Sequence, residues 1–159
     1  MSNIFSGVIT ALVTPFNNGE VDFNSLGQLV EHQQSNGIQG FVINGTTAES
    51  PTLTAEEVAA IFKFVRNQVG HSMPLIMGTG TNSTRSSIEN AKQAQELGAD
   101  GTLVVCPYYN KPTQRGMVAH FKAIAESTEM PLLLYNVPGR TVVSLSAESV
   151  IELSVLKIL

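Results

Sequence analysis

Three tyrosines and two threonines are the side chains of this sequence best suited to move a proton. Tyr108, Tyr109 and Tyr135 are the only tyrosines, and all three lie at the ends of short apolar runs, as do Thr46 and Thr47. A phenol can donate a proton and take it back when a neighbouring hydroxyl completes the path. These residues therefore predict proton-transfer chemistry. The alternative is that each tyrosine only plugs a strand end, with its hydroxyl bonded to a nearby carbonyl.

Two further features could bind a carboxylate. Gly45-Thr46-Thr47 offers successive backbone N–H groups beside two hydroxyls, which suits a carboxylate or a phosphate. Arg140 is the only arginine shortly after an apolar run, and its planar guanidinium matches a carboxylate. The alternatives are a plain polar turn in the first case and a surface arginine that ties down a loop in the second. Both features are candidates for holding a small acid.

Other polar motifs carry less weight. Gly78-Thr79-Gly80 matches the start of a dinucleotide-binding loop, but Ser83 stands at the position of the third glycine. The three histidines have no metal-ligand spacing. Glu49 could act as an acid or a base, or could cap the helix that follows it. The sequence therefore predicts neither a metal site nor a bound cofactor.

Composition is that of an ordinary globular protein and argues against several functions. Hydrophobic residues make up 43% of the 159 positions, charged residues 14%, and the formal net charge is −4. Nucleic-acid binding would need clustered lysine and arginine, whereas the nine basic residues are scattered. Cys106 is the single cysteine, which excludes an internal disulfide. No leader-like segment and no apolar run of roughly 18 residues is present, so we expect a cytoplasmic protein with neither membrane nor nucleic-acid partners.

Short apolar runs alternate with segments of helical periodicity along the chain. We predict strands at 8–13, 40–43, 74–77, 103–105 and 131–134, and an apolar run at 154–159 that begins a sixth. Helices are predicted at 22–36, 54–69, 84–97, 114–127 and 147–153, with a capping box at Thr54-Ala55-Glu56-Glu57 and Ser146 as a further cap. Continuously apolar strands are typical of a parallel sheet covered on both faces. Such βαβ units form an open doubly wound sheet or a barrel, and in both the active site lies at the carboxyl ends of the strands.

Four motifs occur in order and at suitable spacing: Gly45-Thr46-Thr47-Ala48-Glu49-Ser50, Gly78-Thr79-Gly80, Pro107-Tyr108-Tyr109-Asn110-Lys111-Pro112 and Tyr135-Asn136-Val137-Pro138-Gly139-Arg140-Thr141. Together they resemble the dihydrodipicolinate synthase family of the class I aldolase superfamily, which includes N-acetylneuraminate lyase. The resemblance runs from about Phe5 to the last residue. It implies an α/β fold, a (β/α)8 TIM barrel truncated after about five and a half β/α units. We expect a single partial domain over residues 1–159, with strands 1–5, helices 1–5 and the start of strand 6.

The resemblance also implies a reaction. Members of this family, the 4-hydroxy-tetrahydrodipicolinate synthases, condense pyruvate with aspartate semialdehyde in lysine and diaminopimelate synthesis, without a cofactor, as homodimers or homotetramers. Pyruvate forms a Schiff base with a lysine of strand 6, which is expected beyond Leu159. Lys157 matches a residue at the beginning of that strand and would lie at the wrong end of the barrel. Without an amine nucleophile the covalent step has no route, so we expect the 159 residues alone to be inactive.

Site residues follow from the same resemblance. Thr46, Tyr109 and Tyr135 match the proton-relay triad, with Tyr109 reaching across a tight dimer interface. Thr46 and Thr47 match the residues that hold the pyruvate carboxylate. Arg140 matches the residue that binds the semialdehyde carboxylate at the mouth of the barrel.

A regulatory site and one departure from the family complete the resemblance. In members inhibited by lysine, the regulatory site beside the dimer interface includes residues that match Ser50, Asn82 and Tyr108. Ala55, Val58 and Ser86 fall where some members have His, His and Glu, so we expect no strong lysine inhibition. Ala48 stands where the family usually has glycine, and it would strain the carboxylate loop if that position needed a positive φ.

Two other functions stay open. An N-acetylneuraminate or keto-deoxy-sugar aldolase of the same superfamily would share the Schiff-base chemistry, but Arg140 and Asn110 favour the synthase. The other is a non-catalytic half-barrel that binds a small carboxylate or a partner. Open apolar sheet edges invite pairing with another chain, so we expect the isolated chain to be oligomeric or poorly soluble.

Overall fold

The computed structural model describes residues 5–156 and 158; Lys157 and Leu159, on which two sequence-based expectations fall, lie outside the described residues. The chain divides into two compact units, Met1–Ile76 and Met77–Leu159. The boundary falls within strand β5 (Leu75–Gly78). Hydrogen bonding gives the main sheet the strand order β1-β4-β5-β6-β7. The prediction of a single domain over residues 1–159 stays a prediction.

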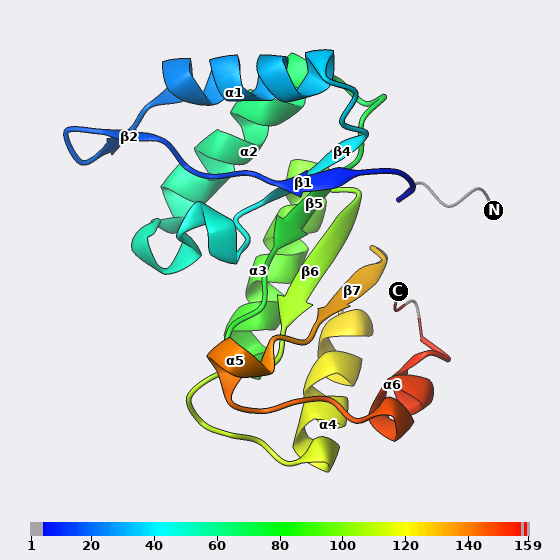
Figure 1. Cartoon of the computed structure of the whole chain (residues 1–159). Coiled ribbons are helices and arrows are strands. Elements are labelled where there is room, and N and C mark those ends of the chain that lie inside the picture. Colours follow the sequence, from blue (N-terminus) through cyan, green and yellow to red (C-terminus); the bar gives the residue numbers. More distant parts are fainter. Residues whose placement is uncertain (1–4, 157, 159) are drawn as a thin grey trace. The chain divides into compact units, whose positions relative to one another are not determined.

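The first unit contains two parallel strands and the helices that follow them (Figure 1). Strand β1 (Ile9–Ala11) pairs in parallel with β4 (Gly40–Ile43), with Ile9 opposite Gly40. The N–H of Phe41 donates to the carbonyl of Pro74 at 3.1 Å, which aligns β4 with the start of β5. After β4 come two short 3-10 helices, η1 (Thr46–Ala48) and η2 (Ser50–Thr52). The polar turn predicted after the second strand is therefore a pair of tight helical turns.

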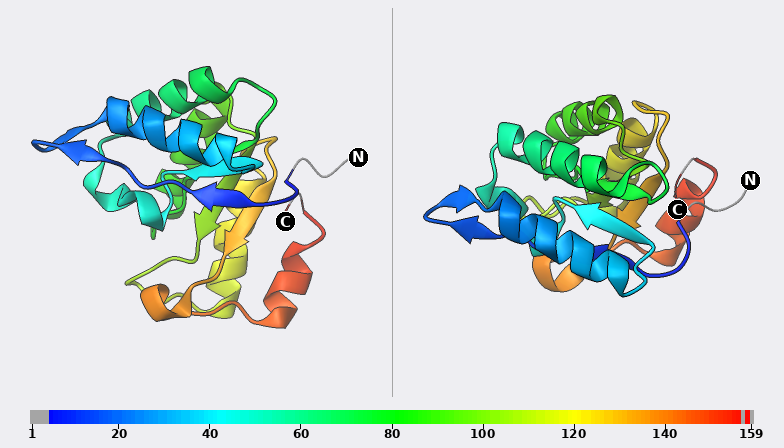
Figure 2. Two further views of the ribbon diagram at one scale, coloured as in Figure 1. Left: turned by 45° about the horizontal axis from the view of Figure 1, so that its top comes forward. Right: turned by 90° about the horizontal axis from the view of Figure 1, so that it is seen from above.

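A small hairpin that the sequence-based prediction did not include follows β1. Its strands β2 (Phe16–Asn17) and β3 (Glu20–Val21) pair antiparallel and project beyond β1 in both views of Figure 2. Asn18 and Gly19 form the turn with φ of 53° and 88°. Asn-Gly is the commonest signal for a two-residue hairpin loop, because both residues tolerate positive φ.

Helices α1 (Phe23–Ser35) and α2 (Ala55–Val69) pack against each other in the first unit. Asp22 caps α1 by accepting from the N–H of Ser25 at 3.0 Å. Thr54 and Glu57 form the predicted capping box at the start of α2. The Phe23 and Phe64 rings lie 5.2 Å apart between the two helices. Apolar side chains buried in this unit include Leu26, Val30, Phe41, Ile43, Ile61, Phe62, Val65 and Leu75.

The second unit continues the alternation of strands and helices. It contains α3 (Thr84–Leu97), β6 (Gly101–Val105), α4 (Gln114–Ala125), β7 (Leu132–Tyr135), α5 (Pro138–Thr141) and α6 (Ala147–Leu153). Strands β6 and β7 pair in parallel, with Val105 opposite Tyr135. A parallel bridge between Leu132 and Ile158 lies where the sequence predicts the start of a sixth strand.

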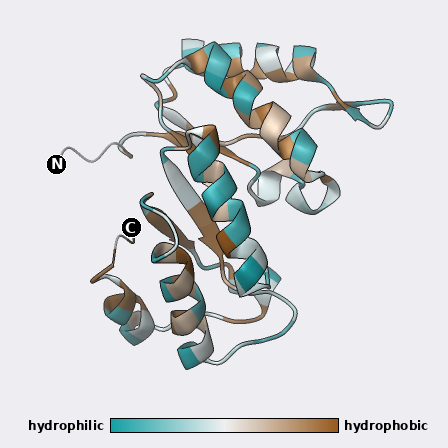
Figure 3. Cartoon of the chain, turned by 180° about the vertical axis from the view of Figure 1, so that it is seen from behind, coloured by the Kyte–Doolittle hydropathy of each residue, from teal (hydrophilic) through white to brown (hydrophobic). Residues whose placement is uncertain are grey.

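Apolar side chains from β6, β7, α3, α4 and α6 form the core of the second unit. Figure 3 shows apolar colouring on the strands and a largely hydrophilic outer face on α3. The buried members of this core are Ala91, Val104, Cys106, Met117, Phe121, Ile124, Ala125, Leu132, Leu145 and Leu153. Val104 of β6 and Leu132 of β7 are buried in this core, whereas Leu133, Leu134 and Tyr135 of β7 are only partly buried.

Candidate active site

The two threonines lie in the 3-10 turn after β4. Gly45 is the N-cap of η1 in an extended conformation, and Thr46 and Thr47 are exposed. The N–H groups of Ala48 and Glu49 close the turn on the carbonyls of Gly45 and Thr46, each at 3.1 Å. The N–H groups of Thr46 and Thr47 precede these bonds, as the first donors of a helical turn do. The turn can therefore offer two N–H groups and two hydroxyls to an anion.

The condition under which Ala48 would strain this turn, a positive φ, is not met. Ala48 is buried and does not have a positive φ; the left-handed residue of this turn is Glu49, with φ 58°. The Ala48 carbonyl accepts from the buried hydroxyl of Thr14 at 2.9 Å. Alanine therefore fits this position. The hydrogen bond from Thr14, which follows β1 in the chain, stabilises the turn.

The Gly78-Thr79-Gly80 motif has a packing role in the second unit. A Cβ on Gly80 would lie 2.5 Å from the Val105 nitrogen, so only glycine lets this segment approach β6. Thr79 is buried, its N–H donates to the Leu103 carbonyl at 3.0 Å, and its hydroxyl pairs with that of Thr102. These contacts explain Thr79 and Gly80 of this motif through their packing against β6.

Tyr108 and Tyr109 lie in the loop after β6, and both are exposed. Tyr109 has a φ of 73° and its side chain is 86% accessible to solvent. The Asn110 side chain donates to the Asn82 carbonyl at 3.0 Å, and its N–H donates to the Tyr108 carbonyl at 2.9 Å. The tyrosine loop is thus joined to the loop after β5, and Asn82 lies close to the loop that carries Tyr108. Ser50, the third residue matched to a regulatory site, is half-buried in η2 of the first unit.

Tyr135 ends β7 and is half-buried, and its carbonyl accepts from the N–H of Cys106 at 3.0 Å. This bond places the end of β7 beside the end of β6. Burial raises the pKa of the Cys106 thiol, which packs against the Asn136 side-chain oxygen at 3.6 Å. Cys106 is therefore a buried residue of the second unit's core.

Arg140 lies exposed in the single-turn helix α5, two residues after its first residue, Pro138. The buried Thr141 hydroxyl lies within hydrogen-bond distance of two carbonyl acceptors, that of Val143 at 2.8 Å and that of Val137 at 3.2 Å. Val142 follows in the left-handed conformation. Helix α5 is not among the helices that the sequence predicts; proline in its first turn is the signal that it begins here.

His120 of α4 is a buried polar residue that the sequence-based prediction placed only as a helical position. Its Nδ1 lies 2.9 Å from the Thr84 hydroxyl, and burial lowers its pKa to about 4. No group of three or more metal-ligating side chains occurs among residues 5–156 and 158. No helix in this part of the chain combines the length and apolar character needed to span a bilayer.

Comparison with known proteins agrees with these motifs. The model of the dihydrodipicolinate synthetase family matches residues 4–159. The chain belongs to this family. It is 54% identical over 153 residues to 4-hydroxy-tetrahydrodipicolinate synthase of Bdellovibrio bacteriovorus, covering 96% of this chain and 52% of the relative. It is 50% identical over 151 residues to the enzyme of the same name from Bacillus subtilis, covering 94% of this chain and 52% of that one.

Solved structures of dihydrodipicolinate synthases have the same fold over this region. The Bacillus anthracis structure superposes with a TM-score of 0.91 at 50% identity, covering 94% of this chain and 52% of that one. The Thermotoga maritima structure gives 0.94 at 45% identity, covering 96% and 52%. The prediction of a (β/α)8-type fold truncated after about five and a half units is confirmed. The chain spans about half the length of the curated relatives it matches.

Proposed function

We propose that the protein is a 4-hydroxy-tetrahydrodipicolinate synthase, a lyase that condenses pyruvate with aspartate semialdehyde. The observation that carries this proposal is the family match over residues 4–159, in a chain whose candidate polar side chains all follow strands of the parallel sheet. In β/α barrels the chemistry lies at this end of the strands. No cofactor is needed, because a lysine amine supplies the covalent activation.

Binding of the first substrate is the role proposed for the turn after β4. The hydroxyls and backbone N–H groups of Thr46 and Thr47 would hold the pyruvate carboxylate, while a lysine beyond Leu159 attacks the ketone carbon of pyruvate. The amine forms a C–N bond, and the carbonyl oxygen leaves as water once it has received two protons. An exposed turn with successive donors, as observed here, supports this role.

Proton movement is the role proposed for Thr46, Tyr109 and Tyr135. Schiff-base formation takes a proton from the amine and delivers protons to the departing oxygen, and enamine formation takes one from the pyruvate methyl. Phenol and threonine hydroxyls can pass these protons along because each both donates and accepts. The 86% exposure of Tyr109 supports a second subunit as the surface that covers it, in a homodimer or homotetramer.

Arg140 is proposed to bind the carboxylate of aspartate semialdehyde. Its exposed guanidinium follows β7, on a helix whose first turn is fixed by Pro138 and Thr141. A planar fork pairs with a carboxylate through two parallel hydrogen bonds. Arg140 and Asn110 also favour the synthase over a sugar-acid aldolase of the same superfamily.

Ser50, Asn82 and Tyr108 are proposed to contribute to a regulatory lysine site, with weak inhibition because Ala55, Val58 and Ser86 are neither basic nor acidic. The cytoplasmic location stays a prediction.

The test is to treat the full-length protein with pyruvate and borohydride and measure its intact mass, then assay turnover of aspartate semialdehyde against N-acetylneuraminate. We expect one reduced pyruvate adduct per chain and turnover of the semialdehyde alone. The 159-residue chain serves as the control and should form no adduct, because the lysine proposed to react with pyruvate lies beyond Leu159. Turnover of the sugar acid instead would identify an aldolase, and no adduct on the full-length protein would refute the Schiff-base proposal.

A further inference from the structure

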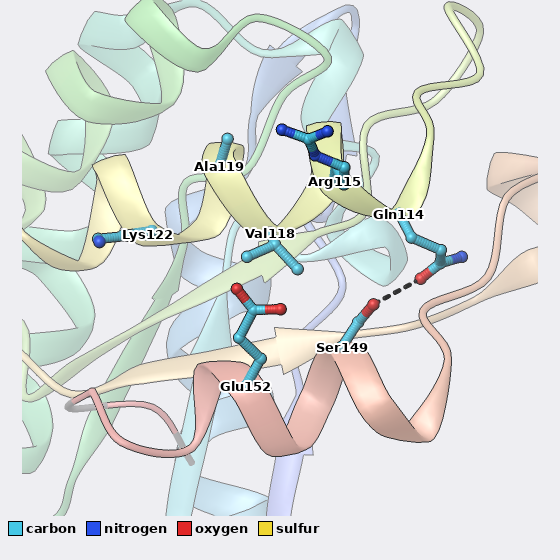
Figure 4. Close-up of a pocket in the computed structure, with 7 residues that line it drawn as sticks. All are labelled: Gln114, Arg115, Val118, Ala119, Lys122, Ser149 and Glu152. Atoms are coloured by element: carbon cyan, nitrogen blue, oxygen red, sulfur yellow. Dashed lines mark hydrogen bonds between the residues drawn. The ribbon is translucent and has the colours of Figure 1, made fainter.

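The side chain of Gln114, the first residue of α4, makes three hydrogen bonds to the segment that follows Arg140. Its amide nitrogen donates to the Ser144 carbonyl at 2.7 Å. Its amide oxygen accepts from the N–H of Ser146 at 3.0 Å and from the hydroxyl of Ser149 at 2.8 Å. Figure 4 shows Gln114 reaching from α4 to Ser149 of α6 at one end of the groove between the two helices.

A second amide holds the same segment from β7. Asn136, which directly follows Tyr135, accepts from the N–H of Leu145 at 3.2 Å and donates to the Ser144 hydroxyl at 3.1 Å. Residues 143–146 lie outside any helix or strand, so their backbone groups need partners from elsewhere. The two amides supply those partners at three consecutive residues, Ser144 to Ser146.

We propose that Gln114 and Asn136 are positioning residues for the second substrate, acting through Arg140. The inference rests on the proposed synthase function. The segment they hold joins α5, which carries Arg140, to Ser146, the N-cap of α6. Gln114 also begins the helix that follows the tyrosine loop. The two amides therefore tie together the segments that carry Tyr109, Tyr135 and Arg140, and fix where the guanidinium points.

The Gln114 amide can make all three contacts because it carries a donor and an acceptor at the same end of its side chain. In Gln114→Glu, the carboxylate keeps its two acceptor contacts to Ser146 and Ser149 but loses the donor to Ser144. It also sets a negative oxygen against the Ser144 carbonyl. Gln114→Glu therefore separates the positioning role from a simple role in capping α6, since capping uses only the contacts that the variant keeps.

Gln95 provides a matched control within the same unit. Its side-chain oxygen accepts from the Thr128 hydroxyl at 2.5 Å and from the N–H of Glu129 at 2.8 Å. It holds the loop that leads into β7, at the opposite end of that strand from Tyr135 and Arg140. Gln95→Ala removes two hydrogen bonds to a loop without touching the candidate site.

The experiment measures steady-state kinetics of the full-length enzyme with both substrates. In Gln114→Ala and Gln114→Glu we expect the KM for aspartate semialdehyde to rise about tenfold, as loss of an oriented hydrogen bond predicts, with the KM for pyruvate and the borohydride adduct unchanged. Gln95→Ala should leave both KM values unchanged. Equal changes in both KM values, no change in either, or a normal Gln114→Glu would overturn the inference.

Amide hydrogen exchange of the same full-length variants distinguishes failure of the inference from failure of the proposed function. Gln114→Ala should lose protection at Ser146, whose N–H donates to Gln114, and keep it at Glu129, whose N–H donates to Gln95; Gln95→Ala should do the reverse. If the wild-type protein lacks synthase activity, the proposed function fails, and exchange alone decides whether Gln114 holds this segment. Unchanged protection at Ser146 would show that Gln114 does not hold this segment.

Discussion

Val142 is the residue near the candidate site with the clearest backbone strain. It ends α5 with φ 65° and ψ −11°, and its N–H donates to the Pro138 carbonyl at 2.9 Å. A β-branched side chain in this left-handed conformation costs on the order of 1–3 kcal/mol. The side chain is 68% exposed, so packing offsets little of that cost. The strain lies two residues after Arg140, where the chain must turn sharply toward α6.

Glycine at this position should relieve the strain. We expect Val142→Gly to raise the free energy of unfolding by about 1 kcal/mol, because glycine adopts this conformation freely but loses more backbone entropy on folding. Urea denaturation of the full-length protein would measure the change. Val155→Gly is the control, since Val155 is also exposed but has no positive φ, and it should not stabilise. A Val142→Gly variant no more stable than wild type would contradict this account.

The sequence predicts well which polar side chains lie near the ends of strands, but not which residues those side chains contact. Thr46, Tyr108 and Arg140 follow strands and Tyr135 ends one, because apolar runs fix where each strand ends. The contacts of Gln114 depend on a segment about 30 residues away, and no local spacing reveals them.

Elements with explicit end signals were predicted closely. Strand β4 and helices α3 and α6 have the predicted bounds, and the Ser146 cap accepts from the N–H of Ser149 at 3.2 Å. The hairpin β2–β3 was missed because each strand has only two residues, too few for a periodic pattern. Helix α5 was missed because four residues after a strand do not show helical periodicity.

The contact between His120 of α4 and Thr84 of α3 makes the packing of these helices sensitive to pH. His120 is 5% exposed, and its Nε2 has no hydrogen-bond partner among the residues that the structure describes. Burial therefore favours the neutral ring and lowers the pKa to about 4, from 6.5. The unfolded chain binds a proton at higher pH than the folded one, so stability is complete above pH 6.5 and falls as pH drops toward 4.

Removing this imidazole should flatten the dependence of stability on pH. Across this window the His120 contribution amounts to at most about 3 kcal/mol at 1.36 kcal/mol per unit. His120→Asn keeps an acceptor for Thr84 and should be less stable at pH 7, with a shallower decline between pH 6.5 and 4.5. His71→Asn, at an exposed site, should leave the decline as in wild type. Urea midpoints at several pH values measure it, and an unchanged slope in His120→Asn would refute the assignment.

At the scale of the whole molecule, one edge of the sheet has no further strand paired with it among residues 5–156 and 158. Strand β1 is the last strand in the order β1-β4-β5-β6-β7, with β4 as its hydrogen-bonded neighbour. Val8 and Val13, on either side of β1, are exposed. An uncovered strand with apolar flanks is a template for pairing with another chain. The dihydrodipicolinate synthases that this chain matches are about twice as long, so they have further residues available to cover such an edge.

We therefore expect the 159-residue chain on its own to associate through β1. A lysine on an edge strand opposes such pairing, so Ala11→Lys should lower the average mass of the chain in sedimentation velocity. Ala119→Lys, at an exposed position of α4, changes the net charge equally and should leave the association as it is. If both variants dissociate alike, charge alone drives association, and if neither does, the contact lies elsewhere. The full-length protein should respond differently. If its remaining residues pair with β1, Ala11→Lys should destabilise the fold, because the lysine then opposes a strand pairing within the same chain.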